Sequence, residues 1–373
     1  MKKRVMAILL TAALAASVLG SCVSAGETSS EASEVLASLP SSEPSSEPEK
    51  SSKPPSEVSV SAEPAVDFGP CNPLTGETGY PEEALTKRPV AVMVNNIDAA
   101  LPQRGLAAAD LIYEVVTESG ITRLMAVYAN PDEIPYVGPV RSARHYYVAM
   151  AAPYDPVYVH FGGSPAGKEY ISNLGIDNVD GLTYSNYFYQ DTWRANNRGR
   201  EHSFFIDGET IASIAGKRGY ETDNNLKPLL TFAEENLPTG EDALNVYVPF
   251  SYSYNAGFDY DAEQGVYLKE RNGAAHIDAD TGNVLTYENI LILYTSVTSY
   301  QGDSLRREVA LGSGSGWYVA EGKKYAIKWS KGDSKNQFSF TLEDGTPLEV
   351  NRGKTYVCLT DSSYASATTF TAQ

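Results

Sequence analysis

Hydrophobic residues follow two different patterns along this chain, and the change comes after about residue 239. Before it, short apolar runs without helical periodicity alternate with segments of helical composition, which is the order that an α+β domain produces. The apolar runs predict buried strands at 89–95, 111–117, 122–128 and 157–161. The turn at 118–120 should join the second and third strands into a hairpin.

Three helices are predicted in the same part of the chain. The first, Ser142–Ala151, would use its own first residue as the N-cap. The second begins where the capping residue Ser164 is followed by Pro165, and it ends at Gly175. The third is expected at Gly208–Gly216.

Two further segments complete this part. Residues 181–200 are rich in Tyr, Asn and Arg and are predicted to form a long irregular loop. With Arg200 and His202, this loop mixes aromatic faces, cations and amides, which suits a sugar or an acidic muropeptide but also suits a plain cover over the core. Residues 227–236 are expected to close the first domain.

Short alternating runs separated by turns fill the rest of the chain. The turns carry Gly and Asx signals at 280–283, 343–345 and 351–353, so we expect an antiparallel β-sandwich or barrel. The predicted fold is an α+β domain at 67–238 followed by an all-β domain at 239–373. The runs that predict strands are 244–250, 266–269, 290–294, 325–329 and 355–359.

The first 21 residues have the order of an export signal. A basic start, Met1-Lys2-Lys3-Arg4, precedes an apolar run that is shorter than the roughly 20 residues needed to span a bilayer. The run ends in Leu19-Gly20-Ser21-Cys22, the form that lipoprotein-processing enzymes recognise. We expect cleavage before Cys22, lipid such as palmitate on that residue, and anchoring at the outer face of the cytoplasmic membrane. The alternative is an ordinary signal peptide with an incidental cysteine.

Residues 22–66 are predicted to be a disordered linker. Ser, Glu and Pro dominate this segment, so it cannot bury enough apolar surface to offset its ordering entropy. Its eight Glu against Lys50 and Lys53 supply a third of the formal net charge of −18. A chain this acidic lacks the basic face that duplex nucleic acid requires, so no nucleic-acid partner is expected.

Two cysteines remain after Cys22. Cys71 and Cys358 lie near the two ends of the predicted folded region. Export permits a disulfide between them, whereas many exported lipoproteins keep buried thiols, so both states stay open at this level.

The densest polar signal lies between residues 138 and 165. Arg141, Ser142 and Arg144 stand at a predicted helix start, where exposed backbone N–H groups and the helix dipole favour an anion. The turn Gly162-Gly163 precedes a second helix start. Two guanidinium groups there could bind a carboxylate or phosphate bidentately. The sequence therefore predicts a cationic cleft.

The arginines could instead pair with nearby carboxylates. Glu114 and Glu118 lie in and beside the predicted hairpin. Ion pairs to them would hold the fold together and leave no charge for a ligand. Both interpretations stay open from the sequence.

Signals for catalysis are weak. His160 stands at a predicted strand end and could act as a general base, and Ser164 follows a glycine but lacks the G-x-S-x-G pattern, so an N-cap role is favoured for it. His145 and His202 could join His160 around a metal, but no zinc-binding spacing is present, so neither a metal nor a cofactor is predicted.

Several short motifs stand out when taken together: Asn72-Pro-Leu-Thr-Gly76, Arg88–Asn96, Asp110–Glu114, Gly120–Arg123, Val137–Arg144 and His160–Ser164. This combination resembles the YerB-like bacterial lipoproteins, from about Asp67 to Leu359. The resemblance implies a two-domain envelope lipoprotein and assigns no reaction. It also implies that Glu114, Arg123, Arg141 and Arg144 belong to the family's characteristic polar set.

The leading hypothesis is a surface-tethered binding or scaffolding protein of a Gram-positive envelope, whose partner is an anionic cell-wall component or an envelope protein. One alternative is a wall hydrolase or transferase with His160 as general base. Another is a solute receptor for a transporter, which would need two similar lobes. The candidate ligand-binding residues are Asn95, Glu114, Arg123, Arg141, Ser142, Arg144, His160, Gly162 and Gly163.

Overall fold

The computed structural model describes residues 69–224, 226, 228, 230–233 and 240–372. The predicted signal peptide, the lipidation site Cys22, the linker and half of the segment 227–236 lie outside these residues. The described residues all belong to one compact unit. None of their helices is long and apolar enough to cross a membrane.

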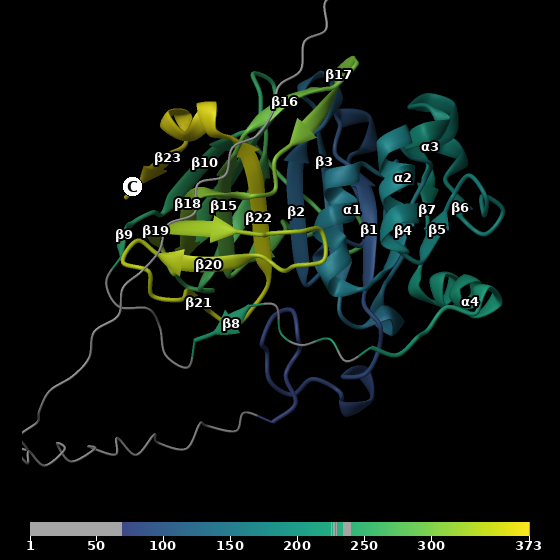
Figure 1. Ribbon diagram of the computed structural model, residues 1–373, viewed down its shortest axis with the longest axis horizontal. Helices are drawn as coiled ribbons and strands as arrows, with labels where there is room; N and C mark the ends of the chain where they lie inside the picture. The colour runs from purple at the N-terminus through teal and green to yellow at the C-terminus, as the bar shows by residue number, and fades with distance from the viewer. Residues whose placement is uncertain (1–68, 225, 227, 229, 234–239, 373) are drawn as a thin grey trace, which may run out of the picture. The chain divides into compact units, whose positions relative to one another are not determined.

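A mixed sheet of eleven strands forms the centre of this unit (Figure 1). Its strands come from both parts of the chain. In spatial order they are β20 (Ser339–Leu342), β19 (Lys323–Ser330), β18 (Ser313–Ala320), β15 (Asn289–Thr295), β22 (Thr355–Asp361), β2 (Leu111–Val116), β3 (Thr122–Tyr128), β1 (Val90–Asn95), β4 (Val157–His160) and β5 (Asn178–Asp180), with β9 (Glu241–Asp242) paired to β19.

A second, antiparallel sheet has six strands, and three two-stranded pairs lie outside both sheets, two antiparallel and one, β21 with β8, parallel. The six strands are β13 (Ala274–Ala275), β12 (Val266–Arg271), β11 (Asn255–Asp261), β10 (Asn245–Pro249) and β23 (Thr369–Thr371), with β14 (Thr286–Tyr287) paired to β12. The pairs are β16 (Val297–Tyr300) with β17 (Asp303–Val309), β21 (Glu349–Val350) with β8 (Thr231–Phe232), and β6 (Tyr189–Gln190) with β7 (Phe204–Phe205).

The α-helices of the described residues lie in the first part of the unit, and so do the short 3-10 helices except Ser362–Ala367. The α-helices are α1 (His145–Ala151), α2 (Pro165–Leu174), α3 (Thr192–Asn197) and α4 (Gly208–Arg218). The short 3-10 helices are Glu82–Ala84, Asp98–Ala100, Leu106–Ala108, Glu118–Gly120, Pro131–Glu133, Ala152–Tyr154, Arg200–His202 and Ser362–Ala367.

Side chains of the large sheet alternate between two apolar cores, because successive residues of a strand point to opposite faces. On β2, Ile112 and Val116 enter the core that the six-stranded sheet and α4 cover, whereas Leu111 and Tyr113 enter the core that α1 and part of α2 cover. Both faces of the central strands are therefore buried, which explains why these segments are continuous apolar runs. Figure 1 shows α1 and α2 in front of the sheet beside β1 and β4.

The large sheet crosses the predicted domain boundary. Strand β22, from the end of the chain, lies between β15 and β2 and runs parallel to both. Ile112 and Glu114 of β2 are thereby opposite Tyr356 and Cys358 of β22. The boundary at 238/239 stays a prediction, but strand pairing joins the two regions edge to edge.

The predicted fold class is confirmed, since the N-terminal region mixes helices and strands and the described C-terminal region consists of strands and one short 3-10 helix. Helix α2 has its predicted bounds, with Ser164 as N-cap and Gly175 as C-cap. The start of the first helix was predicted wrongly at Ser142, because the backbone N–H of Ala143 donates to the Gly162 carbonyl and keeps this segment extended. The irregular loop at 181–200 is also a wrong prediction, since it contains β6 and α3.

A buried polar cluster joins the two sheets. The Glu114 side chain on β2 is 1% exposed, and its carboxylate accepts hydrogen bonds from Tyr356 Oη at 2.6 Å, Thr122 Oγ1 at 2.7 Å and Asn96 Nδ2 at 2.9 Å. The Nζ atom of Lys269, on β12 of the six-stranded sheet, lies 4.0 Å from the same carboxylate. Such a pair forms inside a core only when hydrogen bonds compensate the lost hydration of both charges.

Lys269 is fully buried and also lies over aromatic rings. Its Nζ is 5.0 Å from the ring centroid of Phe258 and 5.1 Å from that of Tyr356. Burial lowers the pKa of Lys269, and the negative charge of Glu114 opposes this shift. The ammonium is therefore stabilised chiefly by its buried partners.

Glu114→Gln should lower the free energy of unfolding by about 3–5 kcal/mol, because it leaves a buried ammonium without its carboxylate. Lys269→Met should cost less, since Glu114 keeps three hydrogen-bond donors. The double variant should cost less than the sum of the single variants, as urea denaturation can measure. Glu241→Gln, which removes an exposed partner of Lys324, is the matched control and should cost less than about 1 kcal/mol. If the double variant lost as much unfolding free energy as the two single variants together, Glu114 and Lys269 would not be coupled.

Candidate functional site

The segment Arg141–Arg144 is positioned by backbone hydrogen bonds at the ends of β1 and β4. The Arg141 N–H donates to the Met93 carbonyl at 2.8 Å, and its own carbonyl accepts from Phe161 N at 3.0 Å. The N–H of Ala143 donates to the Gly162 carbonyl at 2.9 Å. This segment is thus held as an extended bridge between two loops, with its arginine side chains presented on either side of Ala143.

Two of the three predicted arginines pair with one carboxylate. Glu118 accepts from Arg144 Nε in a short contact and from Arg123 Nη2 at 3.3 Å. Arg123 is 4% exposed and also donates through Nη1 to the Ser142 carbonyl at 2.6 Å. Burial, followed by the charge of Arg144, lowers the pKa of Arg123 to about 10. These two arginines therefore hold the loops together. Pairing with Glu118 is the alternative to ligand binding that the sequence left open.

Arg141 is different. In the described part of the chain, its guanidinium has no hydrogen-bond or ion-pair partner, and it lines a cavity of about 440 Å³. Burial lowers the pKa of Arg141, and the charge of Glu201 opposes this shift. An arginine remains charged after such a shift, so the cavity contains a cation whose donors are free.

The cavity contains more positive than negative groups. Arg141, Lys168 and Arg200 line it, together with the carboxylate of Glu201. Its apolar part consists of Phe161 and Phe204, whose rings stack at 4.5 Å, and of Leu182, which is 61% exposed. The remaining lining residues are Val140, Ser142, Gly162 and Gly163.

The Gly162 loop is held by Asp180. One carboxylate oxygen of Asp180 accepts from Gly162 N at 2.7 Å and from Leu182 N at 2.9 Å. Gly162 has a φ of +69°, and a Cβ there would lie 3.0 Å from Leu182 Cδ1. A side chain at this position would be strained and crowded, so glycine keeps this wall of the cavity open.

His160 does not reach the cavity. It is 2% exposed, its Nδ1 lies 2.7 Å from the Gly162 carbonyl, and its Nε2 lies 3.2 Å from Asn178 Oδ1. Both ring nitrogens therefore contact hydrogen-bond acceptors inside the fold, and neither is free to take a proton from a ligand. Ser164 is 4% exposed, and its Oγ accepts from Gly167 N at 3.0 Å as the N-cap of α2.

The predicted histidines are not brought together around one point. His145 is buried with its Nε2 3.1 Å from Glu308, and His202 Nδ1 accepts a hydrogen bond from Asn95 Nδ2 at 2.8 Å. The described residues hold no group of three or more His, Cys, Asp or Glu that could bind a metal ion.

Asn95 and Glu114 lie in the interior and not at the cavity. Asn95 is 1% exposed, and its amide donates to the ring of His202. Since an amide nitrogen is a donor, the His202 nitrogen facing it carries no proton. Burial, and then the charge of Arg141, lowers the pKa of His202, so this imidazole is neutral where it adjoins the cavity wall.

Cys71 and Cys358 are both free thiols, so the disulfide that the sequence left open is absent from the described residues. Cys358 is fully buried in the centre of β22, where burial raises its pKa. Cys358 therefore lacks the lowered pKa of a catalytic thiolate. Cys71 is only partly buried.

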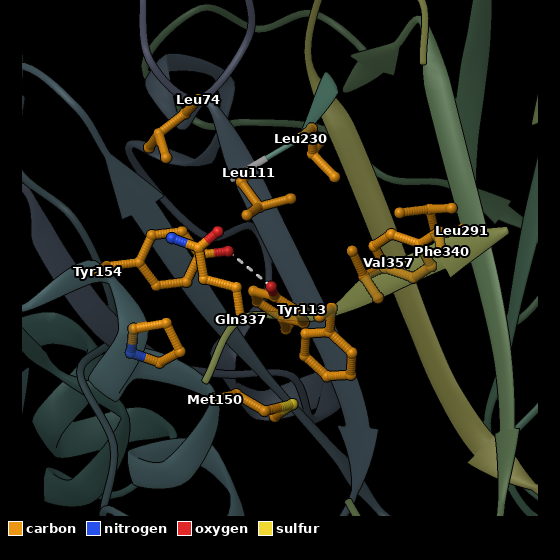
Figure 2. Close-up of a pocket in the computed structure, with 12 residues that line it drawn as sticks. Leu74, Leu111, Tyr113, Met150, Tyr154, Leu230, Leu291, Gln337, Phe340 and Val357 are labelled. Atoms are coloured by element: carbon orange, nitrogen blue, oxygen red, sulfur yellow. Dashed lines mark hydrogen bonds between the residues drawn. The ribbon is translucent and has the colours of Figure 1, made fainter. Parts of the chain in front are cut away.

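A small apolar pocket on the α1 side of the sheet has too little free space for a ligand. Figure 2 shows its lining, in which the hydroxyls of Tyr113 and Tyr154 hydrogen bond to each other at 2.6 Å among residues such as Leu111 and Leu291. Its free volume is about 20 Å³, which is enough for roughly one water molecule. We interpret it as a packing gap.

Sequence reasoning missed Lys168 and Glu201 as cavity residues. Lys168 lies on α2, one turn after the Gly162-Gly163 turn that the sequence did single out. Residues one helical turn beyond a helix start face back toward it, and this spacing was the available signal.

Comparisons with known proteins agree with this architecture. Residues 74–221 match the "Protein of unknown function (DUF3048) N-terminal domain" and residues 246–357 match the corresponding C-terminal domain. The chain is 30% identical over 290 residues to "Putative lipoprotein YerB" of Bacillus subtilis (strain 168), over 76% of this chain and 84% of that protein. The crystal structure of YerB from Bacillus subtilis superposes with a TM-score of 0.73 at 27% identity, covering 81% of this chain and all of that one.

Glu118→Gln should destabilise the protein by about 1–3 kcal/mol at pH 7, because two buried guanidinium groups lose their carboxylate. Burial tends to raise the pKa of Glu118, but the hydrogen bond from Arg144 and the charges of both arginines lower it below its ordinary 4.5. The unfolded chain therefore takes up the proton first, and the stabilisation present above about pH 4.5 is lost as the pH falls further.

Thermal unfolding at pH 7 and at pH 3.5 measures this effect. The difference in melting temperature between wild type and Glu118→Gln should be largest at pH 7 and smaller at pH 3.5. Glu263→Gln, an exposed carboxylate in the turn between β11 and β12 and outside any helix, is the control and should leave stability unchanged at both values. A gap of constant size would contradict the ion pairing.

Proposed function

The chain belongs to the DUF3048 family of proteins of unknown function, and we propose that it is a lipid-anchored envelope protein that binds an anionic wall component or partner peptide. Lipid on Cys22 would hold it at the outer face of the cytoplasmic membrane of a Gram-positive cell, with residues 22–66 as spacer. The N-terminal sequence supports this anchor, as does the name of the Bacillus subtilis relative, a putative lipoprotein.

The observation that carries the binding proposal is the unpartnered guanidinium of Arg141. A charge taken partly out of water without a partner lowers stability, so a fold that keeps one beside Lys168 and Arg200 supports an anionic ligand. The neighbouring rings of Phe161 and Phe204 offer an apolar surface for the body of that ligand. An arginine in such a setting can bind a carboxylate or phosphate through two parallel hydrogen bonds.

Binding without chemical conversion is favoured over catalysis. A hydrolase or transferase would need a free general base, and both nitrogens of His160 contact acceptors in the interior. Ser164 is used as a helix cap. A cationic cavity therefore supports a binding protein, because the nearby His160 and Ser164 are engaged in hydrogen bonds within the fold and are not free to react.

Arg141→Ala should weaken binding of purified, soluble peptidoglycan fragments about tenfold or more, because a charge-assisted hydrogen-bond pair is lost. Isothermal titration calorimetry on the mature chain, with Cys22→Ser to omit the lipid, measures this change. Arg141→Lys should recover part of the affinity. Arg218→Ala, which removes an exposed charge on α4, is the matched control and should bind as wild type does.

Two results would contradict the proposal. Equal binding by Arg141→Ala and wild type would remove the cavity from consideration. Equal losses in Arg141→Ala and Arg218→Ala would mean that the fragments respond to general charge alone. The melting temperature of Arg141→Ala should equal or exceed that of wild type, since Arg141 has no partner in the described part of the fold and its desolvated charge is removed.

Lipid attachment has its own test. In the native host, cells fed an alkyne fatty acid should label the protein, and Cys22→Ala should abolish the label because the lipidated residue is gone. Cys71→Ala should be labelled as wild type is and serves as the control. An unlabelled wild-type protein with an intact N-terminus would overturn the anchor.

A further inference from the structure

A second cavity of about 230 Å³ adjoins the Arg141 cavity. The same two chain segments line both cavities, with the earlier residues of each segment at the first cavity and the later ones at the second. Arg141 lines the first cavity and Arg144 the second, and likewise Gly163 lines the first and Ser164 the second. The backbone bridge between Ala143 and Gly163 therefore forms a ridge only about one residue wide between them.

The far wall of the second cavity is the β16–β17 hairpin. This hairpin supplies Tyr300, Arg306 and Arg307. Its Glu308 carboxylate lies 3.1 Å from His145 Nε2 of α1, and its Tyr300 ring lies 5.3 Å from the ring of His145. The hairpin thus packs against the start of α1, opposite the ridge.

The second cavity repeats the composition of the first. Arg306 pairs with Asp303 at 2.5 Å, but Arg307 has no ion-pair partner among the described residues and only a 3.5 Å hydrogen bond to Ser299. The aromatic face is Tyr300, and the unpaired carboxylate is Glu169. Each cavity therefore holds an available guanidinium, an aromatic surface and one uncompensated acid.

We propose that the two cavities form one extended site for a linear acidic glycan that crosses the ridge and places one anionic group near Arg141 and another near Arg307. The proposal rests on the proposed function and names its ligand class. The aromatic surfaces accept the apolar C–H faces of sugar rings, and the arginines accept the anionic substituents. Occupying both cavities with one chain adds the second contact at high effective concentration.

Oligogalacturonates of defined length are suitable probes, because each ring carries one carboxylate. Titrations should use the mature chain with Cys22→Ser, and galacturonate monomer and hexamer. Arg141→Ala should weaken both probes. Arg307→Ala should weaken the hexamer about tenfold and the monomer much less, since only the hexamer is long enough to reach both cavities. Glu169→Gln should strengthen hexamer binding severalfold by removing a repulsive charge.

The outcomes separate the two proposals. If Arg141→Ala weakens both probes but Arg307→Ala changes neither, the extended site is overturned and the proposed function stands. If Arg141→Ala changes neither probe, the proposed function fails and the extended site fails with it. Arg218→Ala is the charge control in each titration, and matched melting temperatures establish that the variants are folded.

Two further ligands test the glycan class. A chitin hexamer has sugar rings without charge and should bind at least about tenfold more weakly than the galacturonate hexamer. A polyphosphate of similar length has charge without sugar rings and should also bind more weakly. Polyphosphate binding equal to or tighter than that of the glycan would overturn the acidic-glycan assignment.

Discussion

The packing of the two sheets depends on a buried carboxylate and a buried ammonium. Glu114 on the large sheet and Lys269 on the six-stranded sheet face each other where neither reaches water. Desolvation of both charges opposes folding, and the hydrogen bonds to Glu114 from Tyr356, Thr122 and Asn96 offset it. A shift of one sheet relative to the other would break all of these contacts at once. The pair therefore fixes how the two sheets pack, and the other elements are arranged around them.

Hydrogen bonds continue from the same cluster toward the loop that carries Glu201. Amide contacts lead from Asn96 through Gln103 to the Asn95 backbone, and the Asn95 side chain donates to the ring of His202. Polar groups on this path are satisfied by one another, as buried groups must be. Arg141 makes no hydrogen bond to this path, so its donors stay unused among the described residues.

Local signals were read correctly where the local chain decides the structure. Ser164, Pro165 and Gly175 predicted both ends of α2, because a cap, an N1 proline and a left-handed glycine act within a few residues. The start of α1 was misplaced, since Ala143 pairs with a loop that follows it by about twenty residues. The motif resemblance to the YerB-like lipoproteins is confirmed. Of the candidate site, Arg141, Ser142, Gly162 and Gly163 were found from the sequence and do line one cavity.

The sequence by itself determined the main strands, both ends of α2, the fold class and the concentration of arginines beside a Gly-Gly turn, because these follow from patterns within short segments. Only the tertiary structure decided which charged side chains form ion pairs within the fold. Glu118 takes Arg123 and Arg144, and Glu114 is enclosed with a lysine that lies 155 positions further along the chain. Ion pairing depends on distances set by sheet order and packing, and no local pattern contains those distances.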